Sequence, residues 1–115
     1  MKKLILLGAV VGLLASCSTP VKSLYSWYDY EDATYQYSKK PTDEAKTKMM
    51  AQYLKLIENQ KGTRKVVPPG LYAEYGYALY MSGKKEDGLN FLKQEIKLYP
   101  ESETYISRII KQLEK

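Results

Sequence analysis

The chain has 115 residues, with 18 lysines and arginines against 13 acidic residues, no histidine and one cysteine. This length suits one small domain, and a net charge of +5 without a concentrated basic stripe argues against a nucleic-acid binder. The composition also lacks the commonest general base and leaves a single thiol. We therefore expect a protein that is not an enzyme and has no catalytic residues, no cofactor and no metal site.

Residues 1–16 have the organisation of an export signal. A cationic head of three residues precedes an apolar run from Leu4 to Leu14. The run is shorter than the roughly 20 residues that a membrane-spanning helix needs. Residues 14–17, Leu-Ala-Ser-Cys, match the bacterial lipoprotein box, in which the cysteine receives the lipid. The match predicts lipidation of Cys17, and a cleaved secretion signal with an incidental cysteine is the alternative.

The lipoprotein resemblance also implies a location. Such maturation attaches a diacylglyceryl group to the Cys17 sulfur and usually adds a third chain, which is enough for stable anchoring. Ser18 follows the cysteine, and in enterobacterial lipoproteins this resembles an outer-membrane address. We therefore expect a lipid-anchored protein at the periplasmic face of the outer membrane. Residues 17–24 read as a lipidated tether that holds a domain at 25–115 within about 25 Å of the bilayer.

The most aromatic part of the chain follows the tether. Six of residues 25–37 are aromatic, and alternating tyrosines make a strand the competing interpretation. We predict a helix over 25–38 because the segment leads into a turn and a further helix over 42–60. In that second helix Thr42 is the expected N-cap, and acidic residues occupy the first turn.

Residues 61–70 form a linker that is longer than helix packing requires, and loops of this kind often carry function. Its Arg64 and Lys65 are candidate partner contacts, although a solvated loop is the alternative. Helices over 71–82 and 85–99 should then pair as an antiparallel hairpin across a glycine-containing turn.

Glycines Gly76 and Gly88 lie inside the two helices of this hairpin. Each glycine costs roughly 1 kcal/mol relative to alanine in a helix, so we expect that they permit a close approach of the two backbones. A last helix over 102–114, with Ser102 as its expected cap, shows one apolar face. It resembles the helix that closes a repeat array.

The hairpin resembles a tetratricopeptide unit. When Pro69 opens a 34-residue repeat, bulky or small residues fall where that family's pattern requires them, at Tyr72, Tyr75, Gly76, Leu79, Gly88, Leu92 and Pro100. The resemblance implies an all-α fold, a short tetratricopeptide-like array of helical hairpins with about five helices. Two and a half repeats are fewer than the roughly three that such arrays need, so a partner or the aromatic segment should add stability.

Tyrosine usage is skewed, with 12 tyrosines against one phenylalanine. Tyrosine suits positions where one end of the ring is buried and the other is wet. We expect most of these rings in the core, with Tyr28, Tyr77 and Tyr80 left for a partner.

Five segments together resemble a family of small uncharacterised bacterial lipoproteins, namely 14–17, 30–35, 61–65, 74–76 and 98–102. Members of that family have no assigned activity and are found beside lipoproteins related to the curli secretion pore. The resemblance implies an envelope protein partner and an accessory or scaffold role in an outer-membrane assembly. The alternative is a lipoprotein that holds a glycan or peptidoglycan fragment on a tyrosine-rich face.

Overall fold

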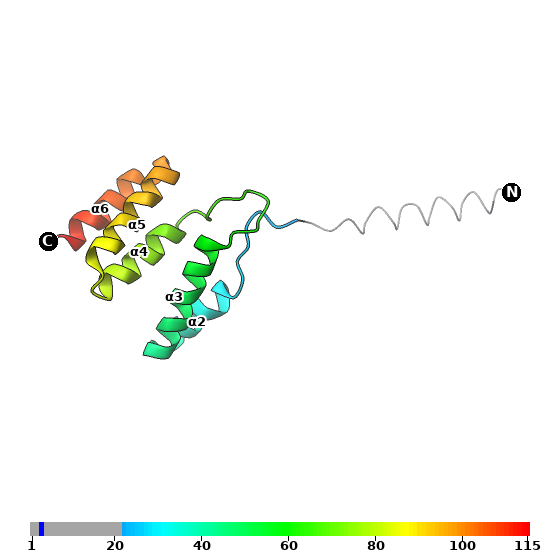
Figure 1. The fold of residues 1–115 in the computed structure, drawn as a ribbon, viewed down its shortest axis with the longest axis horizontal. Coiled ribbons are helices and arrows are strands. Elements are labelled where there is room, and N and C mark those ends of the chain that lie inside the picture. The colour runs from blue at the N-terminus through cyan, green and yellow to red at the C-terminus, as the bar shows by residue number, and fades with distance from the viewer. Residues whose placement is uncertain (1–2, 4–21) are drawn as a thin grey trace.

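The structure, a computed structural model, describes Lys3 and residues 22–115, and within 22–115 it is all-helical, as predicted. Residues 1, 2 and 4–16 of the predicted export signal, Cys17 and most of the predicted tether lie outside the described residues. Five α-helices and one 3-10 turn follow in chain order: α2 (Tyr30–Lys39), α3 (Asp43–Glu58), α4 (Leu71–Met81), α5 (Lys85–Leu98), η1 (Pro100–Ser102) and α6 (Glu103–Leu113). They form the expected hairpins, α2–α3 and α4–α5, and α6 packs on α5 (Figure 1).

The aromatic segment is a helix and not a strand, but the predicted start at residue 25 is wrong. Helix α2 begins at Tyr30, because the residues before it make other contacts. Tyr28 has a φ of 47°, in the left-handed region, which a helix cannot contain. The hydroxyl of Tyr28 donates a hydrogen bond to the Asn59 carbonyl. The preceding residues are therefore fixed against the far end of α3 and not coiled into α2.

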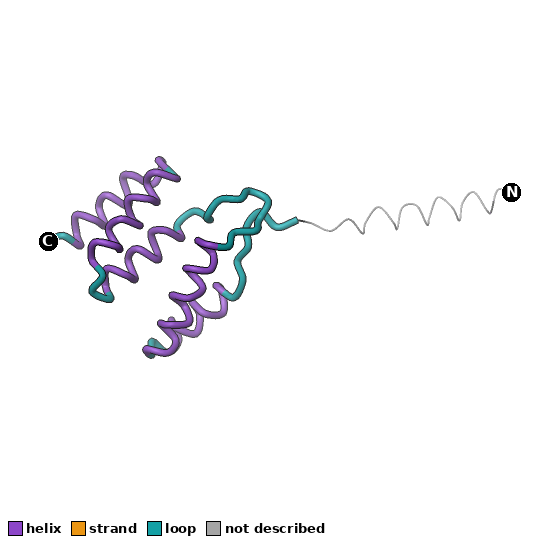
Figure 2. Tube along the Cα trace, in the orientation of Figure 1, coloured by secondary structure: helices purple, strands orange, loops and turns teal. Residues whose placement is uncertain are grey.

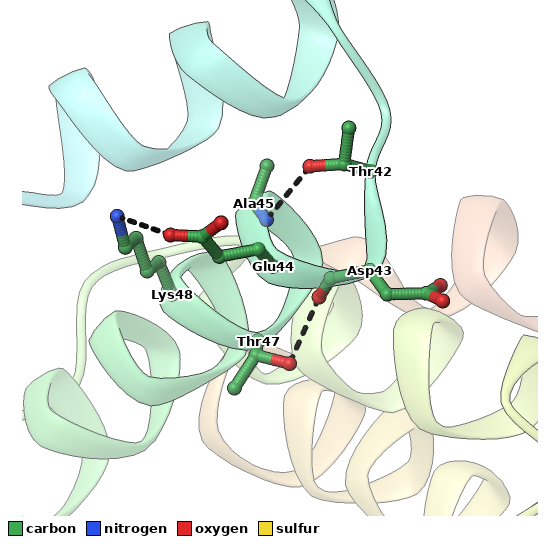
Figure 3. Close-up of polar contacts among 6 residues, drawn as sticks. All are labelled: Thr42, Asp43, Glu44, Ala45, Thr47 and Lys48. Atoms are coloured by element: carbon green, nitrogen blue, oxygen red, sulfur yellow. Dashed lines mark hydrogen bonds and ion pairs between the residues drawn. The ribbon is translucent and has the colours of Figure 1, made fainter.

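Helix α3 begins as expected, with Thr42 as its N-cap. The Ala45 N–H donates to Thr42 Oγ1 at 3.1 Å (Figure 3), which satisfies one of the free donors at a helix start. One turn on, the exposed Lys48 and Glu44 form an ion pair at 3.1 Å. The helix ends at Glu58, two residues before the predicted end.

Glycines hold the α4–α5 hairpin close, as predicted. A Cβ placed on Gly76 would lie 2.6 Å from the Gly88 carbonyl oxygen, and one on Gly88 would lie 2.5 Å from the Gly76 carbonyl oxygen. The connecting turn is tight because Gly83 takes a φ of +94°. The Lys84 N–H then reaches the Leu79 carbonyl at 3.0 Å. At positions 76 and 88, only residues without a side chain allow the backbones of α4 and α5 to come this close.

One apolar core joins the two hairpins. Buried side chains from α2, α3, the linker and α4 form a single cluster, which consists of Ala33, Met49, Tyr53, Leu56, Val67 and Leu71. Leu92 of α5 and Ile106 of α6 are buried further along the array. The linker is therefore part of the core at Val67, which sequence spacing alone did not suggest.

Residues 22–28, here called the strap, run beside the linker, as the ribbon and tube show (Figures 1 and 2). The Thr63 N–H donates to the Ser23 carbonyl at 3.1 Å, and the Arg64 N–H donates to the Leu24 carbonyl at 3.2 Å. The extra length of the linker is thus used to hold the strap. The predicted boundary between tether and domain, after residue 24, lies inside this paired segment.

Helix α6 begins differently from the prediction. The Ser102 hydroxyl donates to the Tyr99 carbonyl at 2.7 Å and accepts no helix N–H, so Ser102 is not a side-chain cap. The short η1 turn precedes the helix instead. Among the helices of the described part, none has the length and apolarity needed to cross a bilayer.

Candidate functional site

Two adjoining hollows share lining residues on α4. The first, of about 500 Å³, lies between α2, α3 and α4, and the second, of about 440 Å³, lies between α4, α5 and α6. Glu74 and Tyr77 line both hollows. We call the combined depression the Tyr77 groove. Its position follows from the repeat layout, because the first helix of each hairpin and the closing helix α6 all contribute side chains to it.

Large apolar side chains are exposed in this groove. Tyr77 is 48% exposed, Met81 60% and Tyr105 69%, and each lines one or both hollows. Exposed apolar side chains scattered singly are ordinary, whereas a group of them along a depression marks an interaction surface. The groove therefore presents the kind of surface that binds another molecule.

Glu74 is the charged centre of the groove. Its two carboxylate oxygens accept from the Tyr30 hydroxyl at 2.9 and 2.7 Å, which links α4 to α2. Burial, and then the hydrogen bond to Glu74 and its charge, raise the pKa of Tyr30 well above its ordinary value. Burial and the Glu74 charge likewise raise the pKa of Tyr53. Both phenols therefore stay neutral, and the Tyr30 hydroxyl, which donates to both carboxylate oxygens, fixes Glu74 in place.

The charges that line the two halves of the groove differ. The hollow between α4 and α6 is lined by Glu74, Glu95 and Glu101 and by no lysine or arginine. The hollow on the α2 side contains Lys46 as well as Glu74. A ligand with a cation at one end and apolar groups along its length would complement this distribution.

Sequence reasoning missed Glu95, which is only 2% exposed. Its carboxylate accepts from the Gly70 N–H at 2.6 Å and from the Ala73 N–H at 3.4 Å. Both donors belong to the start of α4, where the helix dipole favours an anion. The spacing from Gly88 and Leu92 places residue 95 on the buried face of α5, and this was the available signal. Glu95 is thus occupied in holding α4 to α5.

The structure separates the five predicted partner residues. Tyr77 lies exposed in the groove. Tyr80 is half-buried, and its hydroxyl donates to the Leu113 carbonyl at 2.7 Å, so it ties α4 to α6. The other three, Tyr28, Arg64 and Lys65, lie in the strap and the linker and line neither hollow of the groove.

Tyr105 and Glu74 were not predicted as site residues. Tyr105 precedes the buried Ile106 on α6, and its ring remains outside the core. Within residues 22–115 no cluster of three or more aspartate, glutamate, histidine or cysteine side chains is placed to hold a metal ion. What the groove offers chemically is apolar contact, hydroxyl groups, carboxylates and, on the α2 side, the Lys46 ammonium group.

Comparison with known proteins gives one match. A family model described as Domain of unknown function (DUF4810) matches residues 24–109. No curated protein matches the chain, and no solved structure matches it. The matched span begins inside the strap and extends into α6, so it includes most of the strap as well as both hairpins.

Proposed function

The chain belongs to this family of unknown function, and from that premise we propose that it is a lipid-anchored protein-interaction module, a scaffold or accessory component of a bacterial outer-membrane assembly. The observation that carries the proposal is the Tyr77 groove, with Tyr77, Met81 and Tyr105 exposed along it. Hot spots of protein interfaces are enriched in tyrosine, and helical grooves commonly bind extended or helical segments.

The groove also suggests the chemistry of the partner segment. Apolar side chains of the partner would cover Tyr77 and Met81, and removing those surfaces from water would supply most of the affinity. A lysine or arginine of the partner would lie near Glu74 and Glu101, where no basic residue of this chain lines the hollow. The partner segment is therefore apolar with at least one cation.

The anchoring part of the proposal rests on the lipoprotein box at residues 14–17. Acyl chains on Cys17 would hold the domain at the periplasmic face of the outer membrane. A lipoprotein related to the curli secretion pore is the proposed partner. This identity rests on the family resemblance alone.

Crosslinking in the native organism, with the mature lipoprotein as bait, tests the proposal. The variant Tyr77→Ala with Tyr105→Ala should lose a specific envelope protein, which the purified wild-type chain should then bind directly. Tyr35→Ala is the matched control, because Tyr35 is 55% exposed on α2 but lines neither hollow. Equal capture by both variants contradicts the proposal.

A glycan or peptidoglycan fragment is the second candidate ligand. The exposed rings of Tyr77 and Tyr105 favour it, since sugar rings also pack on exposed aromatic faces and the nearby carboxylates and hydroxyls can bond to sugar hydroxyls. Calorimetric titration with cell-wall fragments separates the candidates. Saturable heat that disappears in Tyr77→Ala with Tyr105→Ala, without any captured protein, would favour the glycan.

A further inference from the structure

Positive charge gathers at one end of the domain. Residues 22–28 and 59–66 contain four cations, Lys22, Lys61, Arg64 and Lys65, and no acidic residue. The rest of the chain from residue 17 onward contains 12 lysines and arginines against 13 acidic residues. The net positive charge of the predicted mature chain therefore resides entirely in the strap and the adjoining part of the linker.

The fold turns these two stretches into one surface. The backbone bonds from Thr63 to Ser23 and from Arg64 to Leu24 hold them side by side, at the end of the domain where the strap begins (Figure 1). The four cations are all exposed. None of them pairs with a carboxylate within the described part of the chain. Their charge is thus available to an anionic partner.

Apolar side chains stand among these cations. Leu24 is 56% exposed, Trp27 42% and Val66 38%. The Trp27 ring packs on Tyr30 with a centroid distance of 5.2 Å, which fixes its position while part of the ring stays open to solvent. Cations with exposed tryptophan and aliphatic groups are the combination found where proteins meet the headgroup region of a bilayer.

We propose that this surface, formed by residues 22–28 and 59–66, lies on the anionic phospholipid headgroups of the membrane. Charge complementarity supports a lipid surface, because each lysine or arginine near anionic lipid adds roughly fivefold in affinity. The position in the chain supports it as well. Lys22 is five residues from Cys17, which spans at most about 18 Å when extended, so a bilayer at the anchor is within reach.

The surface is separate from the Tyr77 groove. None of its residues lines either hollow of the groove, which is bounded by residues from α2, α3, α4, α5 and α6 and the linker end at Pro69 and Gly70. The membrane and a protein partner can therefore be bound together. Lipid contact through the strap would fix the orientation of the domain, which attachment of the chain through acyl groups at one residue would not do.

Vesicle binding of the mature chain carrying Cys17→Ser tests the proposal without any acyl chain. The probe is a vesicle of phosphatidylethanolamine, phosphatidylglycerol and cardiolipin, compared with a vesicle of phosphatidylcholine. Trp27 is the only tryptophan, so its emission reports contact at the proposed surface. We expect a saturable blue shift with the anionic vesicles, a much smaller one with phosphatidylcholine, and weaker binding at high salt.

Two matched variants locate the effect. Lys61→Gln with Arg64→Gln should weaken vesicle binding by roughly 30-fold, because two cations near the surface are lost. Lys93→Gln with Lys97→Gln removes the same charge from the exposed face of α5 and should leave binding within about twofold. Circular dichroism melting verifies that both variants fold.

Three results would overturn the proposal: equal weakening in both variants, no binding of the unacylated chain to anionic vesicles, or binding to peptidoglycan sacculi alone. Each of these results concerns the surface formed by residues 22–28 and 59–66 and does not bear on the function proposed for the Tyr77 groove. Conversely, the variant Tyr77→Ala with Tyr105→Ala should lose the protein partner and still bind vesicles as the wild-type chain does.

Discussion

In the α4–α5 hairpin two glycines let the backbones touch, with a Cβ at Gly88 placed only 2.5 Å from the Gly76 carbonyl oxygen. The α2–α3 hairpin has no glycine in either helix and is held through side chains and distant segments. Tyr28 bonds to Asn59, and Tyr30 bonds to Glu74 of the next hairpin. The α4–α5 hairpin is thus locked by contacts within itself, and we call it the locked hairpin. The α2–α3 hairpin, which we call the side-chain-held hairpin, depends on contacts with residues far along the chain.

This difference has consequences for function. The locked hairpin supplies α4, which presents Tyr77 and Glu74 at the centre of the groove. The other hairpin supplies the opposite wall, and its position depends on the neutral Tyr30 hydroxyl and on the strap. We therefore expect changes to the α4–α5 hairpin to cause the larger losses of stability, and changes to the α2–α3 hairpin to alter the groove at a smaller cost in stability.

Alkaline pH should produce the largest effect. Burial, with nearby acidic groups, raises the pKa of Tyr30, Tyr53 and Tyr75 above the ordinary value, and burial beside the Tyr25 phenol raises the pKa of Tyr99 to about 12. The unfolded chain releases these protons near pH 10, before the folded chain does. The contribution of these neutral tyrosines to the free energy of unfolding is therefore fully present below about pH 10. It falls as the pH rises further, over a window that ends near pH 12 for Tyr99.

Tyrosinate absorbance, recorded together with circular dichroism, checks this expectation. Part of the tyrosine ionisation should coincide with the loss of helix. In Tyr30→Phe the fall of stability with pH should be shallower, and in the exposed Tyr35→Phe it should be unchanged. Ionisation of every tyrosine near pH 10 with the helices intact would contradict the assigned burial.

Gly88→Ala should break the locked hairpin. The new Cβ would lie 2.5 Å from the Gly76 carbonyl oxygen and 2.7 Å from the Tyr80 nitrogen, both of which are backbone atoms that cannot rotate away. The overlap outweighs the roughly 1 kcal/mol that alanine gains in helix propensity, and we expect a net loss of about 2 kcal/mol. Urea unfolding measures it, with the exposed Asn90→Ala as a control that should be neutral or slightly stabilising.

Glu95→Gln tests the second link within the same hairpin. The substitution keeps the shape but removes the charge that the Gly70 and Ala73 N–H groups bond to, and it brings an amide N–H₂ toward those donors. We expect a loss of about 1.5 kcal/mol in the free energy of unfolding. Glu86→Gln, an exposed first-turn residue of the same helix, should cost much less. Equal costs would mean that Glu95 does not hold the start of α4.

Thr42→Ala should have the smallest effect, because it removes one cap of the side-chain-held hairpin. The bond from the Ala45 N–H to Thr42 Oγ1 disappears, and an exposed N-cap of this kind is worth between about 0.5 and 1 kcal/mol. Thr47→Ala is the control, since Thr47 Oγ1 only donates back to the Asp43 carbonyl (Figure 3). Thermal melts of the two variants should differ, with Thr42→Ala lower.

The locked hairpin was predictable from sequence, and the side-chain-held hairpin only in part. Thr42, Gly76, Gly88 and the turn at Gly83 are local features whose effect does not depend on distant residues. The start of α2 was misplaced because the strap bonds to residues 59–64, more than 30 residues away. Local periodicity carries no information about such bonds.

The groove was also predicted in part. Tyr77 was expected to face a partner and is exposed in the groove, whereas Tyr80 on the same helix reaches the Leu113 carbonyl. Which of two neighbouring tyrosines is free depends on where α6 ends, and sequence spacing does not give this. Tyr105 and Glu74 gain their importance only when α2, α4 and α6 are brought together.

Site-specific photocrosslinking at Tyr77 tests the central claim most directly. A photoreactive phenylalanine analogue replaces Tyr77 in one chain and Tyr35 in another, and both are expressed in the native organism at wild-type level. We predict one discrete adduct with an envelope protein from position 77, and none from position 35. Adducts of equal yield from both positions, or none from position 77, would contradict the account of the Tyr77 groove as a protein-docking site.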